Sequence, residues 1–234
     1  MFTLIAERIN MTRKSIREKV WQRDEEFIKG EAANQTSAGA THIDVNAGGD
    51  PAKEVEDMVW LTGVVSRATN LPIAFDSTNP DALEAGLKLC NRPGTIINSI
   101  SGEKSRIEKV LPLVKKYSTG VVALLMDDTG MPEDYEGRIK IMHKLADIIK
   151  KQEISMDRVY FDPLVRPAST NPEQARNVLD AVAAAKKEYP ECHIALGLSN
   201  ISFHPMGVRG KLSWIPISET DLINPVMDPT MVHP

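Results

Sequence analysis

Short apolar runs, each closed by an aspartate or an asparagine, recur along the chain. They occupy the segments Ile43–Asn46, Ile73–Ser77, Ile96–Ser99, Val159–Pro163 and Ile194–Phe203. Each run has the length and the β-branched content of a buried strand. The run at 194–203 breaks at Gly197 into small and amide side chains. This pattern predicts strands that each present a polar group at one end.

The segments between these runs have the spacing of amphipathic helices. After a first apolar run at 3–9, strands are predicted at residues 41–45, 72–75, 95–97, 120–126, 159–161 and 193–196. The first helix is predicted over residues 23–40, with Gly39 as its stop signal. Asn79-Pro80 and Asn171-Pro172 have the pattern of an N-cap followed by proline at the first helical position. Strict alternation of strands and helices predicts a parallel sheet.

Seven such units favour a closing barrel over an open sheet. The competing doubly wound sheet normally has a glycine-rich phosphate turn after its first strand, and Glu7-Arg8-Ile9-Asn10-Met11 is not such a turn. The expected fold class is therefore α/β, a (β/α)8 barrel. The carboxyl ends of barrel strands all lie at one face, where active sites are built, so the polar strand ends are expected to meet there.

The residues after Phe203 depart from the barrel pattern. A seventh helix and an eighth strand should follow, but Pro205, Pro216 and Pro225 would interrupt any long helix. Only the segment 225–229 resembles a strand that ends in Asp. We expect a barrel core at 1–203 and an atypical C-terminal segment at 204–234, with an irregular or incomplete seventh helix and eighth strand. Irregular closure and a truncated or rewritten tail both remain open.

The composition is that of a globular protein with enough apolar mass for a core: 234 residues, 42% hydrophobic and 26% charged. A net charge of −4 argues against a nucleic-acid partner. The apolar start is too short for a signal peptide, and no apolar run reaches membrane-spanning length. Cys90 and Cys192 form no CxxC pair, which favours free thiols in a reducing cytoplasm. The five histidines lack metal-ligand spacing, so no metal site is expected.

Six motifs, in order along the chain, carry a family resemblance. They are Ala-Glu-Arg-Ile-Asn at 6–10, His-Ile-Asp-Val-Asn-Ala-Gly at 42–48, Phe-Asp-Ser-Thr-Asn at 75–79, Ile-Asn-Ser-Ile-Ser at 97–101, Phe-Asp-Pro-Leu-Val at 161–165 and Gly-Leu-Ser-Asn-Ile-Ser-Phe at 197–203. With them the chain resembles the pterin-binding TIM-barrel family over residues 1–203. Within it, the chain is most similar to methyltetrahydrofolate:corrinoid methyltransferases, including the folate module of cobalamin-dependent methionine synthase.

The resemblance implies the reaction and the residues that carry it. A methyl group would move between N5 of tetrahydrofolate and the cobalt of a corrinoid, in either direction. Asn200 is the implied catalytic residue, because the family's asparagine at this place approaches N5. The residues expected to bind the pterin are Asp76, Asn98, Asp162, Glu7, Asp44, Asn46 and Ser199. Carboxylates accept hydrogen bonds from the ring's N–H donors, and an amide both donates and accepts.

Helix capping is the alternative role for these residues, because Asp and Asn often cap helices at strand-to-helix turns. Capping would be favoured for any one of them alone, whereas four in the family's order (Asp76, Asn98, Asp162 and Asn200) favour pterin binding. For Asp44 and Asn46, capping or hydrogen bonding at the rim is an equal alternative. Glu7 has the alternative of pairing with Arg8.

The resemblance also implies substrates and partners. Tetrahydrofolate and 5-methyltetrahydrofolate are the implied substrates, and a water relay is expected to bring the proton to N5. No cobalamin-binding Asp-x-His-x-x-Gly occurs in the sequence. The corrinoid (cobalamin) is therefore expected on a separate protein that docks at the barrel mouth. A homodimer is implied as well, with no nucleic-acid or membrane partner.

Two other functions compete with this hypothesis. A dihydropteroate synthase-like enzyme would share the barrel and the pterin pocket, but that family carries a lysine near the seventh strand, and Gly-Leu-Ser-Asn at 197–200 has none. A non-catalytic folate-binding barrel is suggested by the disturbed tail. Tetrahydrofolate binding without methyl transfer would distinguish it from the enzyme.

Overall fold

The computed structural model describes residues 3–165, 172–197 and 223–227. Contacts divide the chain into two compact units. The N-terminal unit consists mainly of residues 3–99 and 116–120, and the C-terminal unit mainly of residues 100–115 and 121–226. Each unit alternates strands with helices.

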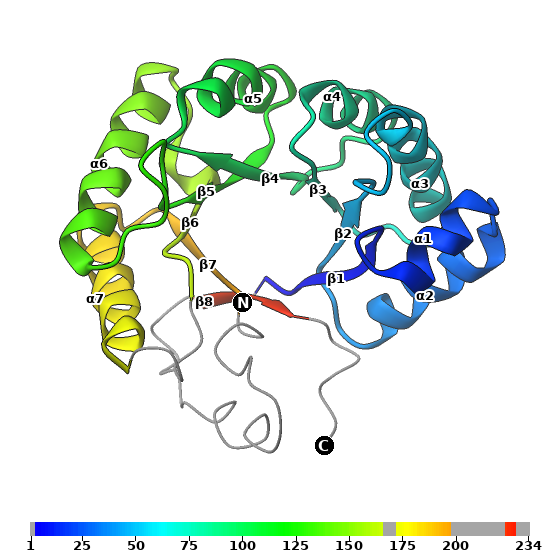
Figure 1. Ribbon diagram of the computed structural model, residues 1–234, viewed down its shortest axis with the longest axis horizontal. Coiled ribbons are helices and arrows are strands. Elements are labelled where there is room, and N and C mark those ends of the chain that lie inside the picture. The colour runs from blue at the N-terminus through cyan, green and yellow to red at the C-terminus, as the bar shows by residue number, and fades with distance from the viewer. Residues whose placement is uncertain (1–2, 166–171, 198–222, 228–234) are drawn as a thin grey trace. The chain divides into compact units, whose positions relative to one another are not determined.

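The N-terminal unit contains four parallel strands. They are β1 (Ile5–Asn10), β2 (His42–Asn46), β3 (Ile73–Asp76) and β4 (Ile96–Ser101), paired in that order, and β4 runs on to the boundary with the other unit. Its helices are α1 (Lys14–Trp21), α2 (Glu25–Ser37), α3 (Glu54–Ala68) and α4 (Pro80–Leu89). Figure 1 shows α3 and α4 side by side along β2 and β3.

Side-chain alternation separates an apolar face of these strands from a polar one. Ile43, Val45 and Phe75 are buried apolar residues, and Phe75 lies against Gly86 of α4, where an added Cβ would come within 2.5 Å of the Phe75 ring. Because successive side chains of a strand point to opposite faces, Asp76 lies on the face away from α4. The same alternation puts Asp44 opposite to Ile43 and Val45. The helices therefore cover the apolar face, and the acidic residues lie on the other.

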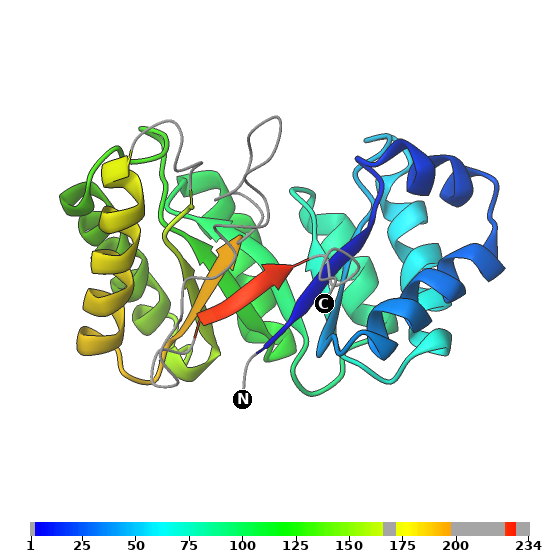
Figure 2. The ribbon, with the colours of Figure 1, turned by 90° about the horizontal axis from the view of Figure 1, so that it is seen from below.

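The C-terminal unit repeats this arrangement. Its strands are β5 (Gly120–Leu124), β6 (Val159–Asp162), β7 (His193–Gly197) and β8 (Ile223–Met227), and consecutive strands pair in parallel. Its helices are α5 (Lys104–Tyr117), α6 (Tyr135–Lys151), the short 3-10 helix η1 (Met156–Arg158) and α7 (Pro172–Glu188). Figure 2 shows α6 and α7 packed side by side.

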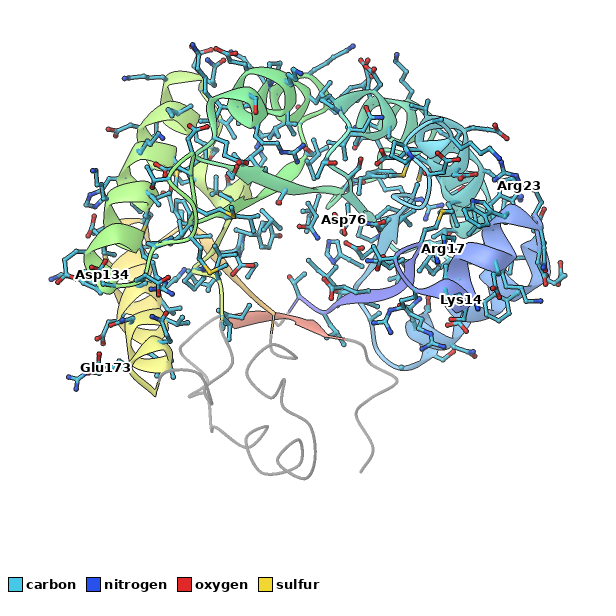
Figure 3. The ribbon with its side chains drawn as sticks, viewed as in Figure 1. Lys14, Arg17, Arg23, Asp76, Asp134 and Glu173 are labelled. Atoms are coloured by element: carbon cyan, nitrogen blue, oxygen red, sulfur yellow. The ribbon has the colours of Figure 1, made fainter. Side chains whose placement is uncertain are left out.

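The helix predicted over residues 23–40 is confirmed as α2, and α1 before it is a further helix that the sequence did not predict. The chain turns between α1 and α2 at Arg23, whose φ is +53°. The Asp24 side chain then accepts a hydrogen bond from the Phe27 N–H at 3.1 Å and begins α2. The Arg23 side chain, labelled in Figure 3, binds Asp57 of α3 at 2.7 Å. A tertiary ion pair thus accompanies a backbone conformation that arginine rarely adopts.

The other predicted elements are found with small shifts of their ends. Asn79 caps α4 by accepting from the Asp81 N–H at 3.0 Å, with Pro80 at the first helical position, as predicted. Helix α7 begins at Pro172, and Asn171 lies outside the described residues.

The C-terminal segment contains the expected eighth strand. Strand β8 pairs with β7 and overlaps the segment 225–229 that the sequence indicated. The helix expected after Phe203 and before the eighth strand falls in a segment that lies outside the described residues, and the domain division at residue 203 stays a prediction. In the described part of the chain, each helix is too short or too polar to cross a lipid bilayer.

Candidate functional site

Polar side chains lie opposite one another at the ends of β2, β3 and β4. Asn46 is the register partner of Asp76, and Asp76 is the register partner of Asn98. The Asn46 Nδ2 donates to Asp76 Oδ2 at 2.8 Å, and the Asn98 Nδ2 donates to Asp44 Oδ2 at 3.1 Å. Figure 3 shows Asp76 on the inner side of the strands, away from the helices. Four of the predicted residues therefore form one polar cluster in the N-terminal unit.

Helix capping does not account for the acidic residues of this cluster. Asn79 caps α4, and Lys53 occupies the N-cap position of α3. Asp76 and Asp44 are themselves parts of β3 and β2. Asn46 has a second contact in the turn after β2, because its Oδ1 accepts from the Gly48 N–H at 2.9 Å. The rim hydrogen bonding that the sequence left open for Asn46 is thus present beside its contact with Asp76.

Asp44 is the most deeply buried member of the cluster, with only 1% of its surface exposed. Its pKa is raised well above the ordinary value, first because burial disfavours the charged form. The nearby carboxylates of Asp76 and Glu7 raise it further, and the hydrogen bond from Asn98 opposes the shift. The Asp44 Oδ1 is buried without a hydrogen-bond partner among the described residues. This environment favours the protonated acid.

Glu7 belongs to the same cluster through an irregularity in β1. Ala6 pairs with Ile43 and Ile9 pairs with Val45, so Glu7 and Arg8 both lie opposite the single residue Asp44. Such bulges re-aim side chains and are common beside active sites. Arg8 forms its ion pair with Glu31 of α2, at 3.1 Å. The electrostatic effect of Glu7 on Asp44 places its carboxylate near the polar cluster.

Asp162 ends β6 in the C-terminal unit. Its Oδ1 accepts from the Leu164 N–H at 2.8 Å, and Leu164 has a φ of +63°. The Asp162 backbone carbonyl accepts from the Leu125 N–H at 2.9 Å. Burial raises the pKa of Asp162 from 3.8 to about 6, against the lowering effect of the hydrogen bond from Leu164. The predicted binding residue is therefore a carboxyl group that titrates just below neutral pH.

Arg138 of α6 supports the backbone that follows Asp162, and the sequence did not reveal it. Its side chain is completely buried. The guanidinium Nε donates to the Pro163 carbonyl at 2.9 Å, and Nη2 donates to Gln174 Oε1 of α7 at 2.8 Å. The only sequence signal is a basic residue on the apolar stripe that continues through Met142 and Leu145. Arg138 thus connects the end of β6 with α6 and α7.

Ser77 supports the end of β3 in a similar way. Its hydroxyl donates a hydrogen bond to the buried Glu54 carboxylate at the start of α3. The Ser77 N–H donates to the Asn98 carbonyl at 3.3 Å, and the Asn79 N–H donates to Ser77 Oγ at 2.9 Å. The residue after Asp76 is therefore fixed to both neighbouring elements. Glu54 is separated from the predicted site residues in sequence, so no motif indicated this contact.

Two predicted residues, Ser199 and Asn200, lie outside the described residues. Within the described ranges, no group of three or more His, Cys, Asp or Glu side chains is arranged to hold a metal ion. The predicted residues within the described ranges are thus the polar cluster of β1–β4 and, in the C-terminal unit, Asp162.

The ionisation of Asp162 is expected to make stability depend on pH. Its folded-state pKa of about 6 lies above the ordinary 3.8, so the folded chain holds this proton more tightly than the unfolded chain does. The stability that this proton contributes to the folded chain is complete below pH 3.8 and is lost as the pH rises through 6. The free energy of unfolding of Asp162→Asn, relative to that of the wild type, should therefore increase from pH 4 to pH 8, by up to about 3 kcal/mol.

Urea unfolding at the two pH values measures this difference. Asp180→Asn is the matched control, because Asp180 lies in the same unit with 54% of its side chain exposed. An Asp162→Asn variant with the wild-type pH dependence would show that this carboxyl does not titrate as described.

The family model of pterin-binding enzymes matches residues 6–215 of this chain. The chain belongs to the pterin-binding enzyme family. It is 34% identical over 202 residues to a methylcorrinoid:tetrahydrofolate methyltransferase of Eubacterium limosum, a match that covers 86% of this chain and 74% of the relative. It is 32% identical over 212 residues to methionine synthase of Mycobacterium leprae, again over 86% of this chain but only 17% of that much longer protein.

Solved structures of dihydropteroate synthases share the fold. The enzyme from Clostridium difficile, crystallised in the presence of pteroic acid, matches with a TM-score of 0.64 and 19% identity, over 84% of this chain and 75% of that one. The Xanthomonas albilineans enzyme in complex with 7,8-dihydropteroate matches with a TM-score of 0.60 and 16% identity, over 85% and 72% of the two chains. The family match confirms the expected fold class, an α/β barrel of the pterin-binding type.

Proposed function

We propose that this pterin-binding family member is a methyltransferase that moves a methyl group between N5 of tetrahydrofolate and the cobalt of a protein-bound corrinoid, in either direction. The observation that carries the proposal is the match, over most of both chains, to the methylcorrinoid:tetrahydrofolate methyltransferase. The methionine synthase match involves the same part of this chain and supports the same substrate pair.

The polar cluster of the N-terminal unit has the chemistry that a pterin ring needs. A pterin edge offers an exocyclic amine and ring N–H donors beside acceptor nitrogens and a carbonyl. In the proposed complex Asp76 accepts hydrogen bonds from the donors, and Asn98 both donates and accepts. Asp162, from the C-terminal unit, is proposed as the second carboxylate that accepts from the pterin. A buried site of this kind rejects analogues that lack the partner groups, because its own polar atoms would be left without hydrogen bonds.

Asn200 is proposed to act on N5, and Ser199 to bind beside it. A neutral tertiary amine is a poor leaving group, so N5 must gain positive character on the way to the transition state. A hydrogen bond that strengthens as N5 is protonated stabilises the transition state more than the substrate complex, and only such differential binding raises the rate. We propose that a water relay delivers the proton.

The corrinoid is proposed to arrive on a separate protein that docks at the barrel mouth, where it supplies the cobalt that donates or accepts the methyl group. We also propose that the enzyme works as a homodimer in the cytoplasm. The compartment is supported by Cys90 and Cys192, which are both free and buried thiols.

Mixing the protein with methylcobalamin and tetrahydrofolate under anaerobic conditions tests the proposal. We expect the absorbance of cob(I)alamin to appear at a rate that depends on the protein concentration. In the reverse experiment, 5-methyltetrahydrofolate should consume cob(I)alamin. Tetrahydrofolate binding in calorimetry with no absorbance change in either direction would leave the non-catalytic folate-binding barrel as the better description.

A further inference from the structure

Strand β2 directs two polar side chains at side chains of β3 and β4. Both ends of the Asn46 amide are in use, since Nδ2 donates to Asp76 and Oδ1 accepts from Gly48. Asp44, two residues earlier on the same face, accepts from Asn98 of β4. The polar groups of β2 therefore form hydrogen bonds with Asp76 and Asn98, two of the residues proposed to bind the pterin.

The contact with Asp44 fixes the orientation of the Asn98 amide. A side-chain amide carries its oxygen and its NH₂ group on one carbon, so a flip exchanges an acceptor for a donor. With Nδ2 of Asn98 bound to Asp44 Oδ2 at 3.1 Å, a flip would bring the Asn98 oxygen against Oδ2, which is an acceptor when Asp44 is ionised or carries its proton on Oδ1. The Asn98 oxygen is thereby held on the side away from Asp44, where it can accept a hydrogen bond from a ligand.

The environment of the second oxygen of Asp44, Oδ1, indicates whether Asp44 is ionised or neutral when it accepts the hydrogen bond from Asn98. Oδ1 is buried and has no partner among the described residues. The charged groups that act on Asp44 are the carboxylates of Asp76 on β3 and Glu7 on β1, while Asn98 on β4 is neutral. An ionised Asp44 would place a buried negative charge close to the carboxyl groups of Asp76 and Glu7 and leave an oxygen without a hydrogen bond, which is costly. A neutral acid avoids the added charge and still offers Oδ2 as the acceptor.

We propose that Asp44 is a positioning residue that, as a neutral carboxylic acid, holds the Asn98 amide in the orientation that a bound pterin requires. The proposal rests on the pterin-binding function proposed above.

Two variants separate the positioning role from a charge requirement. Asp44→Asn has the shape of the neutral acid, since its oxygen accepts from Asn98 and its NH₂ group occupies the place of the Oδ1–H. Asp44→Ala removes the partner of Asn98. In calorimetric titrations with tetrahydrofolate at pH 7, Asp44→Asn should retain the wild-type affinity, and Asp44→Ala should bind about tenfold more weakly.

The pH dependence of binding distinguishes the proposed role from a purely structural one, because replacing a residue that only supports the fold would not change it. Above pH 7, where Asp162 with its pKa of about 6 is already ionised, wild-type affinity for tetrahydrofolate should fall as Asp44 loses its proton, and Asp44→Asn should lack this decrease. An Asp44→Asn variant that binds as weakly as Asp44→Ala would show that the carboxylate itself is required, and would overturn the proposal.

Nuclear magnetic resonance tests the same idea without folate. The ¹³C shift of the Asp44 carboxyl at pH 7 should be that of a protonated acid. The Asn98 side-chain NH₂ signals should be alike in the wild type and Asp44→Asn and should change in Asp44→Ala. An ionised Asp44 at pH 7 would overturn the proposal even if Asp44→Ala fails to fold. Failure of tetrahydrofolate to bind the wild type would instead count against the proposed function and leave the spectroscopic result to stand alone.

Discussion

Replacing Asn200 with alanine is expected to slow methyl transfer by about 10²–10³-fold, the effect of removing one preorganised donor that stabilises developing charge. Tetrahydrofolate affinity should change far less, because the contact with N5 strengthens only as that nitrogen is protonated. Stopped-flow measurement of cob(I)alamin formation gives the rate, and calorimetry gives the dissociation constant.

The split between rate and affinity is the decisive feature of this prediction. If Asn200→Ala loses rate and affinity by the same factor, Asn200 binds the ground state and has no special role at N5. Unchanged rates would remove it from the catalytic site.

Replacing Asp76 with alanine is expected to raise the tetrahydrofolate dissociation constant by roughly 10–100-fold, the equivalent of one charged hydrogen bond. The variant loses the acceptor for the pterin donors and also leaves the Asn46 Nδ2 without its 2.8 Å contact. The rate at saturating folate should change less than the affinity does. Calorimetric titration of both proteins at pH 7 measures the effect.

Asp81→Ala is the matched control for this experiment. Asp81 is an exposed aspartate in the first turn of α4, five residues along the chain from Asp76 and outside the polar cluster. Its replacement should leave the dissociation constant unchanged. Equal weakening by the two replacements, or none by Asp76→Ala, would contradict the role assigned to Asp76.

Most of the strand framework could be predicted from the sequence, because a buried parallel strand is a short apolar run with clear ends. Helix α1 and the turn that separates it from α2 could not, since the chain turns at an arginine with φ of +53° where glycine would be the usual signal. That turn coexists with the tertiary contact between Arg23 and Asp57, which no local pattern contains.

The members of the polar cluster could also be predicted, but their hydrogen bonds could not. Parallel pairing brings Asn46, Asp76 and Asn98 to one level, as their common position at strand ends suggested. Which amide faces which carboxylate depends on strand register and on the irregularity of β1 beside Glu7, and both are tertiary properties. The buried Arg138 went unpredicted for the same reason, because its acceptors belong to segments far from it in sequence.

A crystal structure of the protein with tetrahydrofolate bound tests the central claim most directly. We expect the polar edge of the pterin ring to lie within about 2.7–3.2 Å of side-chain atoms of Asp76, Asn98 and Asp162. A folate bound with its ring away from these three residues would contradict it.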